Sequence, residues 1–192
     1  MKVHLLQSLQ QFFGYPELQK IDPNTQEMKD IASPDYQYRF SQAVIPSVIV
    51  GLSKFLHTEQ GWRLLQSGEN YPNWGSRVFG RHNTELCKRI ADYSDIRWEE
   101  VMHKVHEMLE RAIWMVRNSG IKSAADMKLF IEAERNYALT YLPAKINLGE
   151  LLGDDSLDDG THKMQGPLSN LMKSLGNSFD SIEKNTDGHN EK

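Results

Sequence analysis

Apolar residues along most of the chain recur three or four positions apart, which is the spacing of one face of an α-helix. The densest apolar segment is Ala43–Leu52, and it lies inside a longer helical pattern over residues 34–57. Pro46 falls within this pattern, and proline inside a helix removes a hydrogen bond and clashes with the preceding turn. We therefore expect two helices or a kink there, in the middle of a helical core.

Residues that favour helix N-caps stand before several of the helical patterns. They are Asp22 and Ser33, each followed by proline, and Thr58, Asn83 and Ser123. Glycine or proline follows most of the patterns, as is usual after a helix ends. The predicted helices cover residues 3–13, 34–57, 59–66, 83–93, 97–118 and 127–141. Residues 68–82 show no periodic pattern and are predicted to be irregular.

These patterns predict an all-α fold, a multi-helical orthogonal bundle of about six to eight helices. A single helical domain is expected over residues 1–150. Beyond Gly149 the composition shifts to Gly, Asp, Asn, Ser and Lys, so residues 151–192 are predicted to form an acidic and partly disordered C-terminal tail.

One segment of this tail, residues 167–182, carries an apolar stripe at helical spacing. Its members are Leu168, Leu171, Met172, Leu175, Phe179 and Ile182. The stripe predicts an amphipathic helix that covers the core of its own chain, a second copy of the chain or another protein. The stripe therefore fits both a homo-oligomer and a complex with another protein.

Composition and charge narrow the class of protein. The chain has 192 residues, of which 39% are hydrophobic and 25% charged, as in a soluble globular protein. No segment approaches the about 20 apolar residues that a membrane-spanning helix needs. Polar residues interrupt the first apolar positions, which argues against a signal peptide. A single cysteine, Cys87, excludes an intrachain disulfide. We expect a cytoplasmic protein that does not associate with membranes.

Four short motifs follow one another in an order that resembles the YidB-like family of bacterial all-helical proteins. They are Ile45–Leu52 with its Pro and Gly, Glu59-Gln-Gly-Trp-Arg-Leu-Leu65, Phe79-Gly80 and Ile90–Ile96. The resemblance covers about residues 38–118. Asp95 stands where that family usually has glycine, which puts the backbone geometry of this turn in question. The resemblance implies a helical fold and no catalytic residues, since the function of such proteins is uncharacterised.

The predicted helix 97–118 carries the first candidate site. Glu100-x-x-His103 has the spacing of half a di-iron site in a helical bundle, and His106 follows on the same helix. A metal-binding protein or an enzyme using the His103/His106 face is therefore one alternative. The chain has no second Glu-x-x-His, and the apolar stripe lies on the opposite side of the helix. We expect this face to be solvated and predict neither a metal nor another cofactor.

A short helix, a tight turn and the helix 97–118 also suggest a helix-turn-helix, which would bind DNA. Residues 1–120 hold 14 basic and 14 acidic side chains, while residues 121–192 hold 8 and 12. The second helix opens with Glu99 and Glu100, whose carboxylates would repel phosphates. Nucleic-acid binding is therefore disfavoured.

The segment from Tyr71 to His82 combines aromatic residues with arginines, which dominate the energetics of protein interfaces. Tyr71, Trp74, Arg77 and Arg81 are candidates for a partner surface. The same aromatic residues could instead fix the segment to the core, with Trp74 and Phe79 buried. Because no catalytic constellation stands out, we expect an interaction or scaffold module rather than an enzyme.

Overall fold

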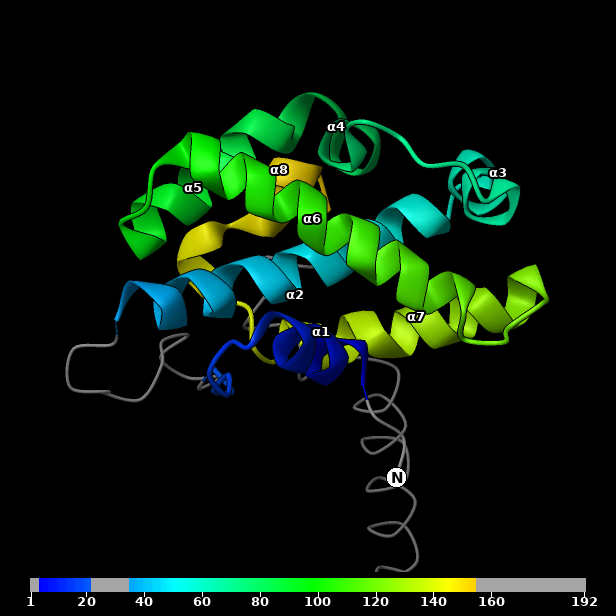
Figure 1. Cartoon of the computed structure of the whole chain (residues 1–192), viewed down its shortest axis with the longest axis horizontal. Helices are drawn as coiled ribbons and strands as arrows, with labels where there is room; N and C mark the ends of the chain where they lie inside the picture. Colours follow the sequence, from blue (N-terminus) through cyan, green and yellow to red (C-terminus); the bar gives the residue numbers. More distant parts are fainter. Residues whose placement is uncertain (1–3, 22–34, 155–192) are drawn as a thin grey trace, which may run out of the picture. The chain divides into compact units, whose positions relative to one another are not determined.

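The computed structural model describes residues 4–21 and 35–154, and these residues form helices without strands (Figure 1). The predicted all-α, multi-helical fold is confirmed. The α-helices are α1 (Leu5–Phe13), α2 (Tyr36–Leu56), α3 (Glu59–Ser67), α4 (Trp74–Phe79), α5 (Asn83–Ser94), α6 (Trp98–Arg117), α7 (Ala124–Leu139) and α8 (Leu148–Leu152). Two short 3-10 helices, η1 (Gly80–His82) and η2 (Ala144–Ile146), precede α5 and α8.

Helix α2 is the centre of this fold. It contacts α1, α3, α4, α5, α6 and α7, and Figure 1 shows it crossing the middle of the described helices. Every residue from Phe40 to Ser53 is buried, which explains why its sequence is apolar on all sides rather than on one stripe.

We expected two helices or a kink at Pro46, and the first of these alternatives is wrong, because the helix runs unbroken from Tyr36 to Leu56. Proline removes one N–H donor, but neighbouring helices bury this part of α2 on every side. Packing of that kind stabilises a helix more than the lost hydrogen bond destabilises it. The hydroxyl of Ser47 also donates to the carbonyl oxygen of Ala43 at 2.8 Å.

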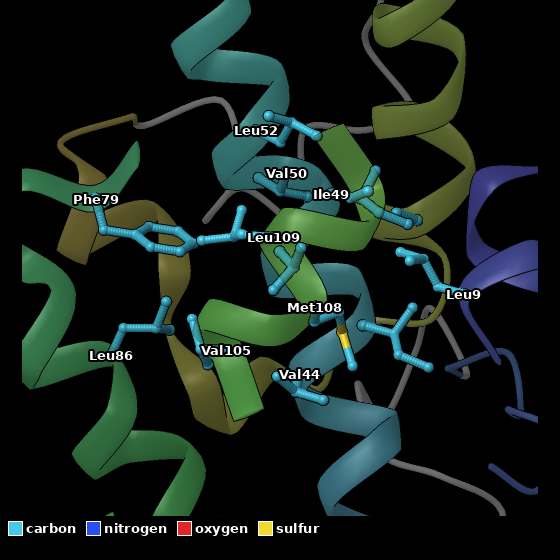
Figure 2. Packing of buried hydrophobic residues seen from close by; sticks show 14 of the residues in the cluster. Leu9, Val44, Ile49, Val50, Leu52, Phe79, Leu86, Val105, Met108 and Leu109 are labelled. Atoms are coloured by element: carbon cyan, nitrogen blue, oxygen red, sulfur yellow. The ribbon is translucent and has the colours of Figure 1, made fainter. Parts of the chain in front are cut away.

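Side chains from α1, α2, α4, α5 and α6 converge in one core (Figure 2). Two glycines allow close contacts in it. A Cβ atom on Gly51 would lie 2.1 Å from Cε1 of Phe79, and one on Gly61 would lie 2.0 Å from the carbonyl oxygen of Phe55. The second contact brings α3 against the end of α2, where the chain bends by 102°. The glycines of the first two family-like motifs therefore serve packing.

Several predicted caps are present. Thr58 accepts the backbone N–H of Gly61 at 2.9 Å, and Ser123 accepts that of Asp126 at 3.0 Å. Ser33 was predicted as the N-cap of α2, but the N-cap is Asp35, whose side chain accepts the N–H of Tyr38. Asn83 is not a cap either. The 3-10 helix before it continues into α5, so Asn83 has helical backbone angles and a buried side chain.

The predicted irregular segment 68–82 is wrong for its second half, which contains α4 and η1. The side chain of Asn73 accepts the N–H of Ser76 at 2.9 Å and so caps α4. Gly80 then ends α4 with a φ of 57°, which glycine adopts without steric cost. This short helix positions Trp74 and Phe79, both of them buried.

A buried carboxylate holds α1 in place. Glu134 on α7 is 2% exposed and accepts the backbone N–H of Leu5 at 2.8 Å. Its other oxygen lies 3.2 Å from Nδ1 of His4, whose ring stacks on Tyr137. This contact caps the N-terminus of α1 and thereby fixes the position of Phe12 at the other end of the helix.

In the part of the chain that the structure describes, no single helix is long and apolar enough to cross a bilayer. The predicted tail stripe Leu168–Ile182 and the Asp22-Pro23 cap lie outside the described residues.

The last described helix, α8, extends past residue 150. Its end is held by Lys54, whose ammonium donates to the carbonyl oxygen of Leu152, and Asp154 lies 3.5 Å from the guanidinium of Arg135.

Candidate functional site

A groove with a volume of about 430 Å³ lies on the surface between the end of α1, one face of α6 and the segment that joins α3 to α4. Helix α1 contributes Phe12 and Phe13, and α6 contributes two glutamates, two arginines and Trp114. Residues far apart in the sequence therefore form one concave surface, which is the usual shape of a binding site.

The guanidinium of Arg111 lies in this groove, close to two aromatic rings. Its central carbon is 3.8 Å from the centroid of Phe12 and 4.2 Å from that of Trp114. A cation over the face of an aromatic ring is attracted by the ring's negative π surface. Both rings are nevertheless solvent-exposed, with 54% of Phe12 and 52% of Trp114 accessible. Two large exposed aromatic residues beside a groove are typical of an interaction surface.

Arg111 makes no hydrogen bond or ion pair to any other described residue. Its Nε atom is buried and has no acceptor. An unsatisfied buried donor costs about 1–3 kcal/mol, and more when the group is charged. Its terminal nitrogens are not buried, so their N–H groups remain accessible from the groove.

The second arginine of the groove, Arg117, is bound by backbone carbonyls at the end of α3. It donates to the carbonyl oxygens of Leu64 at 3.0 Å, Leu65 at 2.9 Å and Glu69 at 2.9 Å. Burial lowers its pKa, and the nearby Tyr71 opposes this shift. Arg117 thus ties α3 and the segment after it to α6, and it forms one side of the groove.

His106 supports the groove from α6. Its Nδ1 accepts the backbone N–H of Trp74 at 3.2 Å, so in the neutral ring Nε2 carries the proton. This Nε2 faces Glu110 at 3.6 Å. The bond satisfies one of the N–H groups that a helix N-terminus leaves without an intrahelical partner. His106 therefore has a structural role, because it fixes the start of α4.

The metal-binding alternative gains no support from the geometry. His103 is exposed and pairs with Glu107 at 3.2 Å, as expected for a solvated helix face. Among residues 4–21 and 35–154, no three His, Cys, Asp or Glu side chains gather where they could hold a metal ion.

Four residues, Tyr71, Trp74, Arg77 and Arg81, were predicted to form a partner surface, and the structure buries one of them and leaves three accessible. Trp74 is 1% exposed and lies in the core, as does Phe79. Tyr71 packs on Trp74 with ring centroids 5.0 Å apart, and Arg77 lies 4.8 Å from the Tyr71 ring. Arg81 is exposed and donates from Nε to His82 at 3.2 Å. Trp74 therefore fixes the segment to the core, while Tyr71, Arg77 and Arg81 remain accessible.

The helix-turn-helix suggestion concerns α5 and α6, which are joined by Asp95–Arg97. Asp95 adopts the left-handed conformation with a φ of 60° at this turn. The exposed face of α6 carries Glu99, Glu100, Glu107 and Glu110. Its opposite face is buried against other helices, so these four carboxylates lie on its accessible side, where they would repel DNA phosphates.

Cys87 is buried in α5, and desolvation raises the pKa of its thiol to about 12. The thiol is therefore protonated and shielded from solvent at neutral pH, which does not fit a nucleophilic role.

Sequence reasoning missed Arg111 and Trp114, and it placed Phe12 only within the predicted helix 3–13. One signal was present, because Trp114 lies outside the apolar stripe of its helix and three residues after an arginine. Residues three apart are neighbours on a helix surface.

Comparisons with protein-family models, with curated proteins and with solved structures find no match for this chain.

Proposed function

We propose that this chain is a non-enzymatic interaction module and that the groove between α1 and α6 binds a protein partner. The observation that carries the proposal is the exposed stack of Phe12, Arg111 and Trp114. Large aromatic residues and arginine are the residues most enriched among those that dominate binding energy at protein interfaces.

The position of the stack on the fold supports the proposal. Glu134 binds the N-terminus of α1, the helix that carries Phe12, while Arg111 and Trp114 stand on the long helix α6. Side chains that already contact one another lose less conformational entropy when a partner binds, so more of the contact energy appears as affinity. An aromatic surface of this kind suits recognition of a peptide segment or a protein loop.

Peptide selection tests the proposal. A library of random 12-residue peptides displayed on phage is selected on the immobilised full-length protein, and the affinities of the enriched peptides are measured. We expect Trp114→Ala and Phe12→Ala each to weaken binding at least about tenfold, a loss of about 1.4 kcal/mol that is typical of an interface anchor.

Trp98→Ala is the matched control. Trp98 is also exposed and on α6, but it lies 16 residues earlier, about 24 Å along the helix axis, and does not line the groove. It should leave the affinities unchanged. If the enriched peptides bind the Trp114 and Phe12 variants as well as the original protein, the groove is not the interaction site.

The proposal includes a cytoplasmic location and a relationship to the YidB-like bacterial proteins. Both rest on the sequence: the first on the single cysteine, which suits a reducing compartment, and the second on the motif order over residues 38–118. The role of Gly51, Gly61 and Asp95 in packing and turn formation is compatible with a family whose shared motifs specify a fold.

A further inference from the structure

We infer that the groove recognises a carboxylate group on its partner, carried next to an apolar side chain, and that Arg111 is the residue that binds it. This inference rests on the proposed function, because it names the chemistry that the same groove selects. It follows from three properties of the site: the unpaired donors of Arg111, the contacts of its guanidinium with two aromatic rings and the partners that the other charged residues already have.

The central carbon of the Arg111 guanidinium lies over the rings of Phe12 and Trp114. These contacts use none of the N–H donors of the guanidinium, which all lie in its plane. A planar fork of N–H donors matches the two oxygens of a carboxylate, which it can bind through two parallel hydrogen bonds. Arg111 therefore lies against two aromatic rings with its donors unused before a partner arrives.

The other charged residues of the groove already have partners. Arg117 donates to three carbonyl oxygens, Glu107 lies 3.2 Å from His103, and Glu110 lies 3.6 Å from His106. Arg111 alone among these described groove residues lacks an oppositely charged or hydrogen-bonding partner. An acceptor on the ligand would satisfy it.

The charge of the groove favours a carboxylate over a phosphate. Two glutamates and two arginines line the groove, and their formal charges cancel. Glu107 and Glu110 would repel an anion, and they would repel a phosphate of about −1.5 to −2 charge more than a carboxylate of −1. Binding must therefore depend on directed hydrogen bonds to Arg111 and on apolar contact with Phe12 and Trp114, rather than on net attraction.

Two small molecules that differ only in the group at issue test the inference. Full-length protein labelled with ¹⁵N is titrated with 3-phenylpropanoate, which combines a phenyl ring with a carboxylate, and with the neutral 3-phenylpropanamide. We expect the carboxylate to bind about tenfold more tightly than the amide, a difference of about 1.4 kcal/mol, with shifts centred on α6 and the end of α1.

Variants assign the effect to Arg111. Arg111→Met should abolish the preference for the carboxylate, and Arg111→Lys should reduce it, because lysine keeps the charge but loses the planar fork. Arg63→Met is the matched control, since Arg63 is exposed and lies outside the groove. Unchanged spectra away from the groove verify that each variant is folded.

Equal affinity for acid and amide, both lost in Trp114→Ala, would overturn the carboxylate inference and leave the groove as an interaction site. Tighter binding of phenyl phosphate than of 3-phenylpropanoate would also overturn it. So would a lack of shifts in the groove with either probe at about 10 mM, which excludes even millimolar affinity. The selected peptides would then decide the proposed function independently.

Discussion

The ring of Phe79 occupies the space in which a side chain at position 51 would begin. A Cβ atom on Gly51 would lie 2.1 Å from Cε1 and 2.5 Å from Cζ of this ring, and Phe79 is itself buried. Helix α4 therefore packs directly against the backbone of α2. Figure 2 shows Phe79 pointing into the same core as Val50 of α2 and Leu109 of α6.

Gly51→Ala should therefore destabilise the protein by about 1–3 kcal/mol, because the inserted methyl group overpacks a filled core. The free energy of unfolding in urea measures this. In a double-mutant cycle with Phe79→Leu, the two losses should sum to more than the double variant shows, since leucine removes the ring edge that clashes. Strict additivity would contradict the contact.

His106→Ala should destabilise the protein by about 1–3 kcal/mol, because the N–H of Trp74 then loses its acceptor. Hydrogen exchange should become faster in α4, where this bond fixes the first residue. His103→Ala is the control on the same helix, and it should change stability by no more than about 0.5 kcal/mol because His103 is exposed. Equal losses in both variants would mean that the bond to Trp74 contributes nothing.

The sequence predicts correctly those helices that carry a single, uninterrupted apolar stripe. Helix α6 was expected over residues 97–118 and is found at Trp98–Arg117, since its stripe spans five turns without interruption. Helix α4 was missed because six residues are too few to establish a period, and the flanking Asn, Pro and Gly favour a loop. The course of α2 through Pro46 depends on neighbouring helices, which no local pattern reveals.

The groove could be predicted only in part. Trp114 stands outside the stripe of α6, and this could have marked it as a surface aromatic residue. Phe12 lies about 100 positions earlier, and its contact with Arg111 depends on how α1 docks onto the fold. That docking is set by a buried carboxylate, Glu134, whose sequence context resembles any other helical glutamate. Long-range contacts of this kind cannot be derived from periodicity.

Stability should fall at alkaline pH because burial raises the pKa of Cys87 and of Tyr15, each to about 12. For Tyr15, the carboxylates of Glu107 and Glu100 add to this effect. In the unfolded chain the thiol and the phenol titrate near about 8.5 and 10, so the unfolded state releases protons first. The stabilisation that these two buried neutral groups provide is complete below about pH 8.5 and is lost as pH rises toward 12.

Urea unfolding at a series of pH values from 7.5 to 10.5 measures this loss. Cys87→Ala should flatten the first part of the decline, because it removes the group that titrates earliest. A free energy of unfolding that stays constant up to pH 10.5 would contradict the burial of both groups in the neutral form.

Glu110→Gln and Glu107→Gln should each strengthen the binding of 3-phenylpropanoate severalfold at low ionic strength, because each removes a negative charge from the groove. Added salt should reduce the gain, since salt screens interactions between exposed charges. Affinity for 3-phenylpropanamide should not change. Glu59→Gln, at an exposed position outside the groove, is the control. Weaker binding of the acid in either groove variant would show that the glutamates help to hold the ligand.

The most direct test of the groove as the interaction site is the response of the four tryptophan indole N–H signals to the tightest selected peptide. Full-length ¹⁵N-labelled protein is titrated, and the signals are assigned by single substitution of each tryptophan. We predict that the indole of Trp114 shifts most and that the indole of Trp98, exposed on the same helix, does not move. A peptide that shifts Trp98 and leaves Trp114 unchanged would contradict the account.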